Sequence, residues 1–513
     1  MNESRDPGEA LDRAMRDGDA DGIARILMGN MWFFYNRDYA TLQSAVALLT
    51  DEVLAKHPVL RLVHPLGGVL AQTGRPFGSE EFESLLEEGD PATVGLILML
   101  QGIATRVSGD IAAAMRSAQR LEEWMGSHEF AASAHGGGPL WLFHHQIGST
   151  YLVAGDTVAA LRHFGAARQI GIPSGSADAE RSAAGRVALV HAIRGSLGEA
   201  ERSLGEALAL PEPTAAYATA AHGTERATAA LLSVELLADD ADQRIAELRA
   251  IDNFEIIWPF ELLAKARLAF GRHDPSAALE HANMAAATHR VQAGSFGADL
   301  IEATNIEALL ALGDLTAAEH AVHTSRSRGP MTRLAVIQAA IHRGDSAQAH
   351  EELRYLGARM ALSPLQRAQA AMFAIRLDAL RGGQVTSHLA EEFARAVTRQ
   401  GYRRLATTMP ATVVPLVRAR LSPDSARAFG AATADLIFAD SSGSVSRALT
   451  DGERRVLEAL PRHETVADIA AALHVSPNTI KTQLRSLYQK IGVGNRADAI
   501  EVSRRMASTH RDG

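Results

Sequence analysis

The chain has 513 residues, of which 47% are hydrophobic and 22% charged, a globular composition that excludes a disordered protein. It contains no cysteine, which excludes a disulfide framework, thiol chemistry and a cysteine-ligated zinc site, and is compatible with a reducing compartment. The formal net charge is −9, which taken alone argues against binding to nucleic acid.

The N-terminal segment is charged and lacks the apolar core that a signal peptide contains. The most apolar stretch, residues 94–104, is shorter than the roughly 18 residues of a membrane-spanning helix. We therefore expect a soluble, cytoplasmic protein with no membrane segment. The length exceeds that of one ordinary core, which indicates several domains or an array of repeats.

From about residue 140 the chain repeats one pattern, an apolar-periodic helix, a break and a second helix rich in small residues. The copies are residues 140–171, 181–210, 261–289, 299–326 and 333–359. The breaks fall at Gly155-Asp156, Gly195-Ser196, Gly271-Arg272, Gly313-Asp314, Gly344-Asp345 and Gly382-Gly383, with a weaker one at Ala238-Asp239-Asp240. At these breaks we expect glycine in the left-handed conformation that ends a helix, and Asp or Ser as the cap of the next helix.

This spacing predicts an all-α fold, a helical solenoid that resembles tetratricopeptide repeats (TPR-like), because no alternating pattern typical of strands is present in the sequence. We expect the repeats to occupy residues 1–439, and a polar linker, residues 440–448, to join them to a tail. The charge divides in a similar way, since residues 445–513 carry +3 and the rest of the chain −12. A basic tail on an acidic body makes the tail the candidate for contact with nucleic acid.

Four helices are predicted in the tail, with N-caps at Thr450, Thr465, Ser476 and Asn495. Glu453 and Asp468 stand three residues after the first two caps, which is the spacing of a capping box. Pro477 follows the third cap at a position that proline favours, and Gly492 ends that helix. The second and third helices, separated by a short turn, predict a helix-turn-helix whose core is residues 465–484.

The third helix of the tail has two different faces. Its apolar residues gather on one side, namely Ile480, Leu484, Leu487 and Ile491. The other side carries Asn478, Lys481, Thr482, Arg485 and Gln489, with Thr479 and Gln483 at its flank. Lys and Arg can donate to guanine and Asn can pair with adenine in the major groove, whereas flanking groups suit phosphates. The alternative is the solvated face of an ordinary amphipathic helix.

The complete tail favours the DNA-binding interpretation, because it resembles the LuxR-type (LuxR/GerE family) DNA-binding domain from end to end, over residues 449–511. The matching residues are Leu449, Thr450, Glu453, Val456, Leu457, Ile469, Ala470, Leu473, Ser476, Thr479, Ile480, Lys481, Thr482, Lys490, Gly492, Val493, Asn495, Arg496 and Ala499. The predicted fold is thus a TPR-like α-solenoid followed by a four-helix LuxR-type helix-turn-helix domain.

The resemblance implies roles for individual residues. Base contacts fall to Lys481, Thr482 and Arg485, to which the helical wheel adds Asn478, and phosphate contacts fall to Ser476, Thr479 and Gln483. The fourth helix is implied to form a dimer, and its candidate residues are Ala499, Ile500, Val502 and Met506. Gly452 replaces a frequent Arg of the family and His463 a frequent Gly. We expect neither departure to touch the recognition surface.

The body resembles a second group of proteins. Residues 31–75 look like the segment that opens the helical-repeat region of the large ATP-binding LuxR regulators. Those regulators carry a nucleotide-switch ATPase, but the sequence here has no G-x-x-x-x-G-K-[S/T] motif. The chain therefore resembles such a regulator without its ATPase domain, and we expect no nucleotide cofactor.

Several other motifs have simpler interpretations. His135-Gly136-Gly137-Gly138 matches an esterase oxyanion motif, but the sequence lacks the G-x-S-x-G elbow that a hydrolase needs. The 20 histidines include no metal-binding motif, and His144 and His145 are expected to serve packing or to face solvent. The four tryptophans, Trp32, Trp124, Trp141 and Trp258, could line a ligand groove but more often form core. We expect neither an enzyme nor a metal site.

The sequence thus predicts a transcription regulator that binds operator DNA as a homodimer through its tail. The repeat region would receive a small-molecule or protein effector. The alternative is a TPR-like protein-binding scaffold whose tail is a dimerisation module.

Overall fold

The computed structural model describes most of the repeat region and part of the tail. The described residues are 6–31, 33–34, 39–57, 60, 86, 91–127, 140–174, 177–248, 257–382, 385–439, 451–463, 465–473, 475–477, 480–481, 483–484, 487–488, 496, 499–500 and 503. Among them every regular element is a helix, and the sole β-interaction is an isolated parallel bridge between Pro410 and Ala439. The predicted all-α class is confirmed.

The first half of the chain is helical in its described parts. Its helices are α1 (Pro7–Asp17), α2 (Ala20–Gly29), α4 (Tyr39–Ala47), α5 (Asp51–Lys56), α9 (Pro91–Val107), α10 (Ile111–Met125), α12 (Leu140–Val153), α13 (Thr157–Ser174), α14 (Ala177–Arg194), α15 (Leu197–Leu208) and α16 (Ala215–Leu236). Those of the second half are α17 (Ala241–Ala246), α18 (Trp258–Gly271), α19 (Pro275–Thr288), α20 (Phe296–Leu312), α21 (Leu315–Thr324), α22 (Pro330–Arg343), α23 (Ser346–Arg359), α24 (Pro364–Gly382), α25 (Ser387–Gln400), α26 (Arg403–Thr407), α27 (Val414–Arg418) and α28 (Pro423–Ala432).

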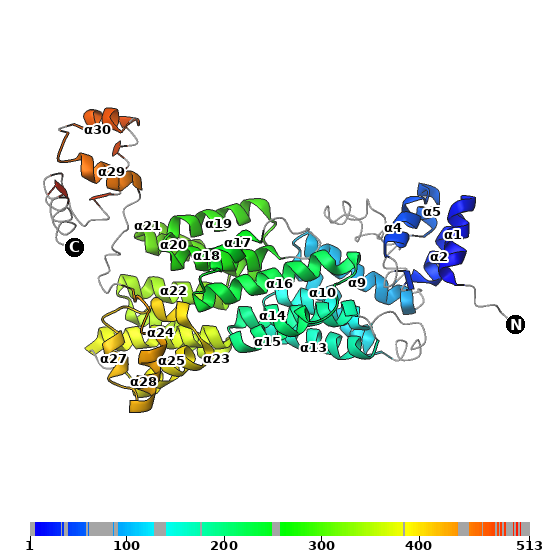
Figure 1. Cartoon of the computed structure of the whole chain (residues 1–513), viewed down its shortest axis with the longest axis horizontal. Coiled ribbons are helices and arrows are strands. Elements are labelled where there is room, and N and C mark those ends of the chain that lie inside the picture. The colour runs from blue at the N-terminus through cyan, green and yellow to red at the C-terminus, as the bar shows by residue number, and fades with distance from the viewer. Residues whose placement is uncertain are drawn as a thin grey trace.

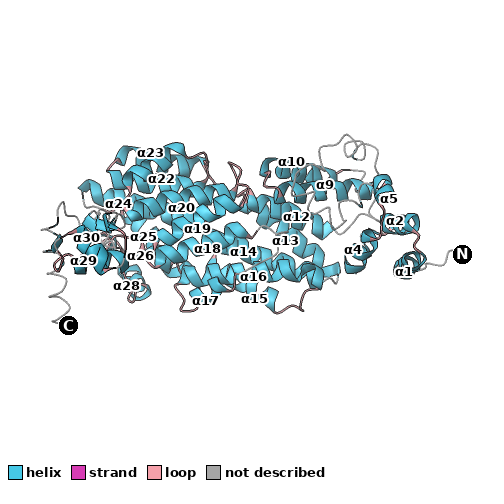
Figure 2. Cartoon of the chain, turned by 90° about the horizontal axis from the view of Figure 1, so that it is seen from above, coloured by secondary structure: helices cyan, strands magenta, loops and turns pink. Residues whose placement is uncertain are grey.

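Most of these helices pack against the helices next to them in the chain (Figures 1 and 2). Consecutive helices such as α12 and α13 pair, and alternate helices such as α14 and α16, or α20 and α22, stack on one another. This pattern is compatible with the predicted solenoid, in which each repeat contacts its neighbours. The contacts of α26 with α16 and of α24 with α14 go further, because they join segments far apart in the sequence.

The breaks between paired helices have the predicted glycine geometry at four places. Positive φ angles of 89°, 82°, 71° and 80° occur at Gly155, Gly195, Gly313 and Gly344. Only glycine adopts this conformation without steric cost, so each residue ends its helix. After three of them an aspartate caps the next helix; in α21, for example, Asp314 Oδ1 accepts from the N–H of Ala317 at 3.0 Å.

The predicted break at Gly271-Arg272 is confirmed, because α18 ends at Gly271, but the predicted left-handed conformation of this glycine was wrong. His273 takes that conformation instead, with φ 56°. Asp274 then caps α19 by accepting from the N–H of Ala277 at 3.0 Å. The residue directly before the capping Asp makes the turn here, and it is a histidine.

Several glycines permit close contact between a helix backbone and an aromatic ring. A Cβ atom added to Gly95 would lie 2.6 Å from Cζ3 of Trp124, and one added to Gly297 would lie 2.8 Å from Cζ2 of Trp258. Such distances are far inside van der Waals contact, so the rings occupy the space that a side chain would fill. Small residues thus allow these helices to approach closely.

We expect Gly297→Ala to destabilise the repeat region by about 1–3 kcal/mol, because the new methyl group would overpack the Trp258 ring. The matched control is Gly205→Ala, in the interior of α15, where an added Cβ meets nothing within 4 Å. That change should raise stability by about 0.5–1 kcal/mol through helix propensity. Thermal unfolding followed by circular dichroism measures both, and equal shifts in the two variants would contradict the packing argument.

The described tryptophans belong to the core rather than to a ligand groove. Trp141 is buried, Trp124 meets Phe143 edge-to-face with ring centroids 5.9 Å apart, and Trp258 stacks on His289 at 4.5 Å. Trp32 lies outside the described residues.

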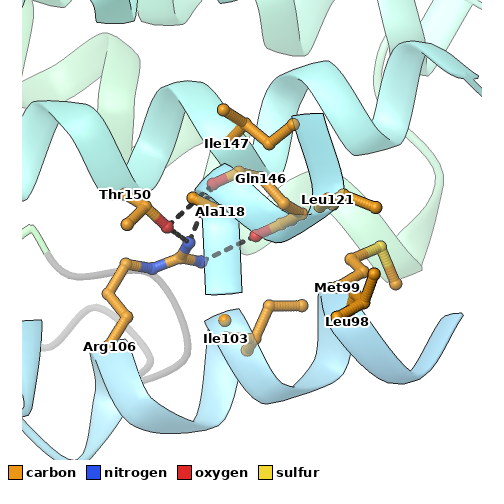
Figure 3. A pocket seen from close by; sticks show the side chains of 10 residues that line it. Leu98, Met99, Ile103, Arg106, Ala118, Leu121, Gln146, Ile147 and Thr150 are labelled. Atoms are coloured by element: carbon orange, nitrogen blue, oxygen red, sulfur yellow. Dashed lines mark hydrogen bonds between the residues drawn. The ribbon is translucent and has the colours of Figure 1, made fainter. Parts of the chain in front are cut away.

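Buried arginines tie neighbouring helices together. Arg106 of α9 donates to the Gln146 carbonyl at 3.1 Å and to Thr150 Oγ1 at 3.0 Å, both on α12 (Figure 3). The cavity beside it has only about 10 Å³, about the room of a single water molecule. We therefore regard this polar contact as structural and the cavity as too small for a ligand.

None of the helices in the described ranges is both long and apolar enough to cross a membrane.

Candidate nucleic-acid interface

The tail has a hydrophobic core of its own. Its buried residues are Val456, Leu457, Ala459, Leu460, Ile469, Ala470, Ile480, Leu484, Leu487 and Ala499, and they form a cluster separate from that of the repeat region. Figure 1 shows α29 (Asp451–Ala459) and α30 (Val466–Ala472) beyond the helices of the repeat region. The linker predicted at residues 440–448 lies outside the described residues, so the domain boundaries stay a prediction.

Helix α30 begins with the predicted capping box. Thr465 Oγ1 accepts from the N–H of Asp468 at 3.1 Å, and the Asp468 carboxylate accepts from the N–H of Thr465 at 3.1 Å. Hydrogen bonds from Thr465 lower the pKa of Asp468, so the carboxylate is the stable form. The reciprocal bonds satisfy two backbone donors at the helix start. The predicted cap at Thr450 lies outside the described residues.

A short turn follows α30 and leads into the next helical segment. The N–H of Val475 donates to the Ala470 carbonyl at 3.0 Å, and the N–H of Ile480 donates to the Ser476 carbonyl at 3.2 Å. Pro477 is helical, so the segment begins directly after Ser476, where the sequence places it. Two helices joined by so short a turn have the arrangement of a helix-turn-helix.

The described part of this segment has the predicted faces. Ile480 and Leu487 are fully buried and Leu484 is 8% exposed, so the apolar stripe packs into the core of the tail. Lys481 is exposed and Gln483 is half-buried at the flank. Other predicted contact residues lie outside the described residues, namely Asn478, Thr479, Thr482 and Arg485. The structure therefore shows one predicted base-contacting side chain directed away from the core.

The beginning of the fourth segment is held by an arginine to which the sequence analysis gave no role. The guanidinium of Arg496 donates to the carbonyls of Leu460, at 2.9 Å, and of His463. These bonds hold the loop between α29 and α30 in place. The sequence signal for this contact is the Asn495-Arg496 pair of the LuxR-like motif. The pair is local in the sequence, but Arg496 bonds to residues of a distant loop.

The candidate dimerisation residues are only partly described. Ala499 has 0% exposure and belongs to the core of the tail, and Ile500 is half-buried against the same core. The side chain of Ala499 therefore serves packing inside the domain. Val502 and Met506 lie outside the described residues, and the role of the segment in dimer formation stays a prediction.

The expectation that Gly452 lies away from the recognition surface was wrong. A Cβ atom added to Gly452 would lie 2.6 Å from Nε2 of Gln483, so the Gln483 amide rests against the backbone of α29. Absence of a side chain at residue 452 gives the amide this space. For His463 the expectation stays a prediction; its backbone is not in the left-handed conformation that favours glycine.

The geometry defines the tail as a helix-turn-helix domain, with a buried apolar face and an exposed lysine on its second helix. Residues 447–503 match the family model of bacterial regulatory proteins of the luxR family. The C-terminal segment is therefore a LuxR-family helix-turn-helix domain, as its residues predict.

Two kinds of curated relatives match the same segment. Over 56 residues the chain is 41% identical to the probable transcriptional regulatory protein NarL of Mycobacterium tuberculosis, which covers 11% of this chain and 26% of that protein. Over 52 residues it is 48% identical to the probable transcriptional regulatory protein SgaR of Hyphomicrobium methylovorum, covering 10% and 25%. The chain thus spans about a quarter of the length of the relatives it matches. No solved structure gave a significant match.

The histidines considered in the sequence form packing contacts. His145 is buried, and Nδ1 of His144 lies 3.1 Å from Nδ1 of His163. Nε2 of His163 lies 3.0 Å from a carboxylate oxygen of Glu122, which also bonds to Arg162. Within the described ranges, groups of three or more acidic, histidine or cysteine side chains suited to a metal ion are absent. The motif at residues 135–138 lies outside the described residues.

Burial and the neighbouring His163 lower the pKa of His144 to about 4. Below its ordinary pKa of 6.5 the unfolded chain binds a proton that the folded chain resists, so stability must fall as the pH falls from about 6.5 to about 4. We expect His144→Asn, which keeps a hydrogen-bonding group near the same place, to reduce the loss in melting temperature between about pH 7 and pH 5 by roughly 1–3 °C. His320→Asn, at an exposed site, is the control. Identical pH profiles for wild type and His144→Asn would refute the effect.

Proposed function

We propose that the protein is a DNA-binding transcription regulator that recognises operator DNA as a homodimer through its C-terminal domain. In this proposal Lys481, Thr482, Arg485 and Asn478 contact bases, and Ser476, Thr479 and Gln483 contact phosphates. The repeat region receives a small-molecule or protein effector. The observation that carries the proposal is the segment after Ser476, which buries Ile480, Leu484 and Leu487 and exposes Lys481.

Three lines of support lead to DNA. The family model that matches residues 447–503 describes bacterial regulatory proteins, and the similar proteins NarL and SgaR are named as probable transcriptional regulators. An exposed cation on the second helix of a helix-turn-helix suits contact with base edges in the major groove. The charge of +3 on residues 445–513, against −12 on the rest, places the attraction for phosphate in the tail.

We infer dimer formation from the small net charge of the tail. A single domain with a net charge of +3 neutralises few phosphates, so its affinity at physiological salt is expected to be weak. Two domains on adjacent half-sites add their binding energies, which gives the specific affinity that regulators need. We therefore expect a roughly palindromic operator.

Selection from a randomised duplex library tests the proposal. The full-length protein, at about 150 mM salt, should enrich a roughly palindromic site. The variant Lys481→Ala/Arg485→Ala should enrich none, whereas Arg462→Ala, at an exposed position in the loop after α29, should enrich the wild-type site. No enrichment by the wild-type protein, together with retained dimer formation, would favour the alternative, a protein-binding scaffold whose tail is a dimerisation module.

A further inference from the structure

A groove of about 440 Å³ lies along α24 and α25, near the C-terminal end of the repeat region. These helices are drawn in yellow in Figure 1. Sites for small molecules in proteins have volumes of roughly 300–1,000 Å³, so the groove is large enough for a metabolite. It is far larger than the cavity beside Arg106.

The lining of the groove is cationic. Three guanidinium groups contribute to it, those of Arg367, Arg395 and Arg399, together with His388 and a single carboxylate, Glu392. Arg395 and Arg399 are one helical turn apart on α25, where like charges repel. Among the described residues, neither of them nor Arg367 forms an ion pair with a carboxylate. The Glu392 carboxylate lies 3.9 Å from Nδ1 of His388. This concentration of positive charge contrasts with the acidic character of the body.

Two of the three arginines form hydrogen bonds to backbone carbonyls near them in the chain. Arg367 Nη1 donates to the Leu362 carbonyl at 2.7 Å, which fixes its guanidinium at the first turn of α24. Arg395 Nε donates to the Glu391 carbonyl at 3.2 Å. The carboxylate of Glu391 is engaged elsewhere, because it accepts from the N–H of Ser422 at 2.6 Å. Burial and the nearby Arg367 lower the pKa of Arg194, which shows how closely positive groups crowd at this place.

A buried tyrosine completes the lining. Tyr402 is only 1% exposed, and its hydroxyl has no hydrogen-bond partner within the described residues. Burial raises the pKa of Tyr402, the buried Glu235 raises it further, and Arg367 lowers it. The hydroxyl thus stays neutral. It is enclosed beside Gly195, where a Cβ atom added to the glycine would lie 3.1 Å from it, so it does not face the groove.

We propose that this groove binds a small organic anion whose carboxylate or phosphate group is held by the three exposed arginines Arg367, Arg395 and Arg399. Guanidinium groups match the oxygens of carboxylates and phosphates with paired hydrogen bonds. A ligand of this kind neutralises the crowded charge. That this anion is the effector of a transcription regulator rests on the proposed function. Binding of the anion to the groove does not rest on it.

The test is thermal unfolding and titration calorimetry of the full-length protein with citrate and with pyrophosphate. Sodium chloride at the same ionic strength corrects for general screening. We expect millimolar citrate or pyrophosphate to raise the melting temperature by roughly 2–4 °C over chloride. The variant Arg395→Gln/Arg399→Gln should weaken binding at least about tenfold.

Controls separate this site from general charge effects. Arg420→Gln/Arg427→Gln removes the same charge at exposed positions outside the groove and should bind the probes as wild type does. No stabilisation over chloride, or an equal loss in both double variants, would overturn the proposal. Binding of polyglutamate without binding of either small anion would also overturn it, in favour of an acidic polypeptide. These measurements contain no DNA, so their failure is distinct from failure of the proposed regulator function.

Discussion

Replacing Lys481 and Arg485 together by alanine is expected to weaken binding to the selected operator by about 2–6 kcal/mol, which is roughly 30-fold or more. Lys481 is exposed on the helical segment whose other side is buried. Arg485 follows it by four residues in the sequence, which is the spacing of about one helical turn. Two cations at this spacing on one face can reach adjacent bases in the major groove. Fluorescence anisotropy with the operator and with a scrambled duplex of equal length measures the effect.

The comparison between the two duplexes decides what the side chains do. If Lys481 and Arg485 contact bases, the operator loses more affinity than the scrambled duplex, and the two affinities converge. The control variant Arg455→Ala/Arg462→Ala removes the same charge from exposed positions outside the recognition segment. It should lower both affinities by a similar, smaller factor. Equal losses on both duplexes for Lys481→Ala/Arg485→Ala would mean that these residues contact phosphates only.

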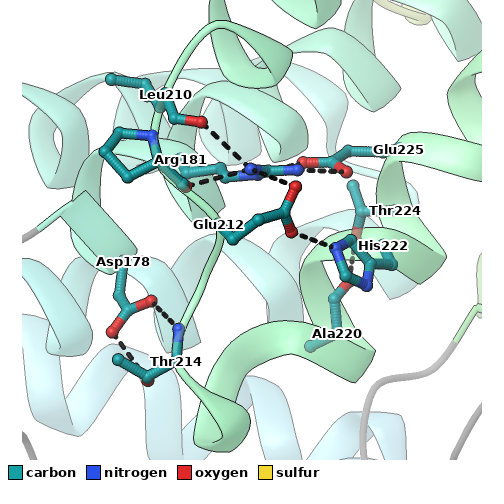
Figure 4. Close-up of polar contacts among 10 residues, drawn as sticks. Asp178, Arg181, Leu210, Glu212, Thr214, Ala220, His222, Thr224 and Glu225 are labelled. Carbon is teal, nitrogen blue, oxygen red and sulfur yellow. Dashed lines mark hydrogen bonds and ion pairs between the residues drawn. The ribbon is translucent and has the colours of Figure 1, made fainter.

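Arg181→Ala is expected to destabilise the repeat region by about 3–5 kcal/mol, because it leaves a buried carboxylate without its partner. Arg181 and Glu225 are both buried, and their side chains form two hydrogen bonds, of 2.8 and 3.1 Å (Figure 4). Arg181 Nη1 also donates to the carbonyls of Leu210 and Pro211, at 3.1 and 3.0 Å. One guanidinium thus joins α14, α16 and the loop between α15 and α16.

Scanning calorimetry measures this loss, with two comparison variants. Arg181→Met/Glu225→Leu removes both charges and should recover most of the stability, since no unpaired ion stays buried. Arg202→Ala breaks ion pairs with Glu199 and Glu206 on the exposed face of α15 and should change the melting temperature little. If Arg181→Ala and Arg202→Ala behaved alike, the buried pair would contribute no more than a surface pair.

The two departures of the tail from the family pattern show where sequence reasoning is limited. That His463 leaves the recognition surface unaffected stays a prediction, although its backbone is not in the left-handed conformation that favours glycine. Gly452 was expected to do the same, yet Gln483 lies against it. The two residues are 31 positions apart and belong to different helices, so only the packing of α29 against the recognition segment reveals their contact.

The sequence by itself determined the features that depend on near neighbours in the chain. The helical period, the capping box at Thr465 and the apolar stripe of Ile480, Leu484 and Leu487 all follow from residues three or four positions apart, because a helix brings such residues together. The family of the tail could also be recognised from the sequence, because its motif lies in one continuous stretch of residues.

Tertiary structure alone decided which distant residues meet. The left-handed turn at His273, the pairing of Arg181 with Glu225 across 44 positions, and the arrangement of Arg367, Arg395 and Tyr402 around one groove have no local signal. Helices of similar composition can pair in many ways, and the choice depends on shape and on the burial of charges over the whole repeat region. These long-range contacts, rather than the helical pattern, bring together the residues of the candidate effector site.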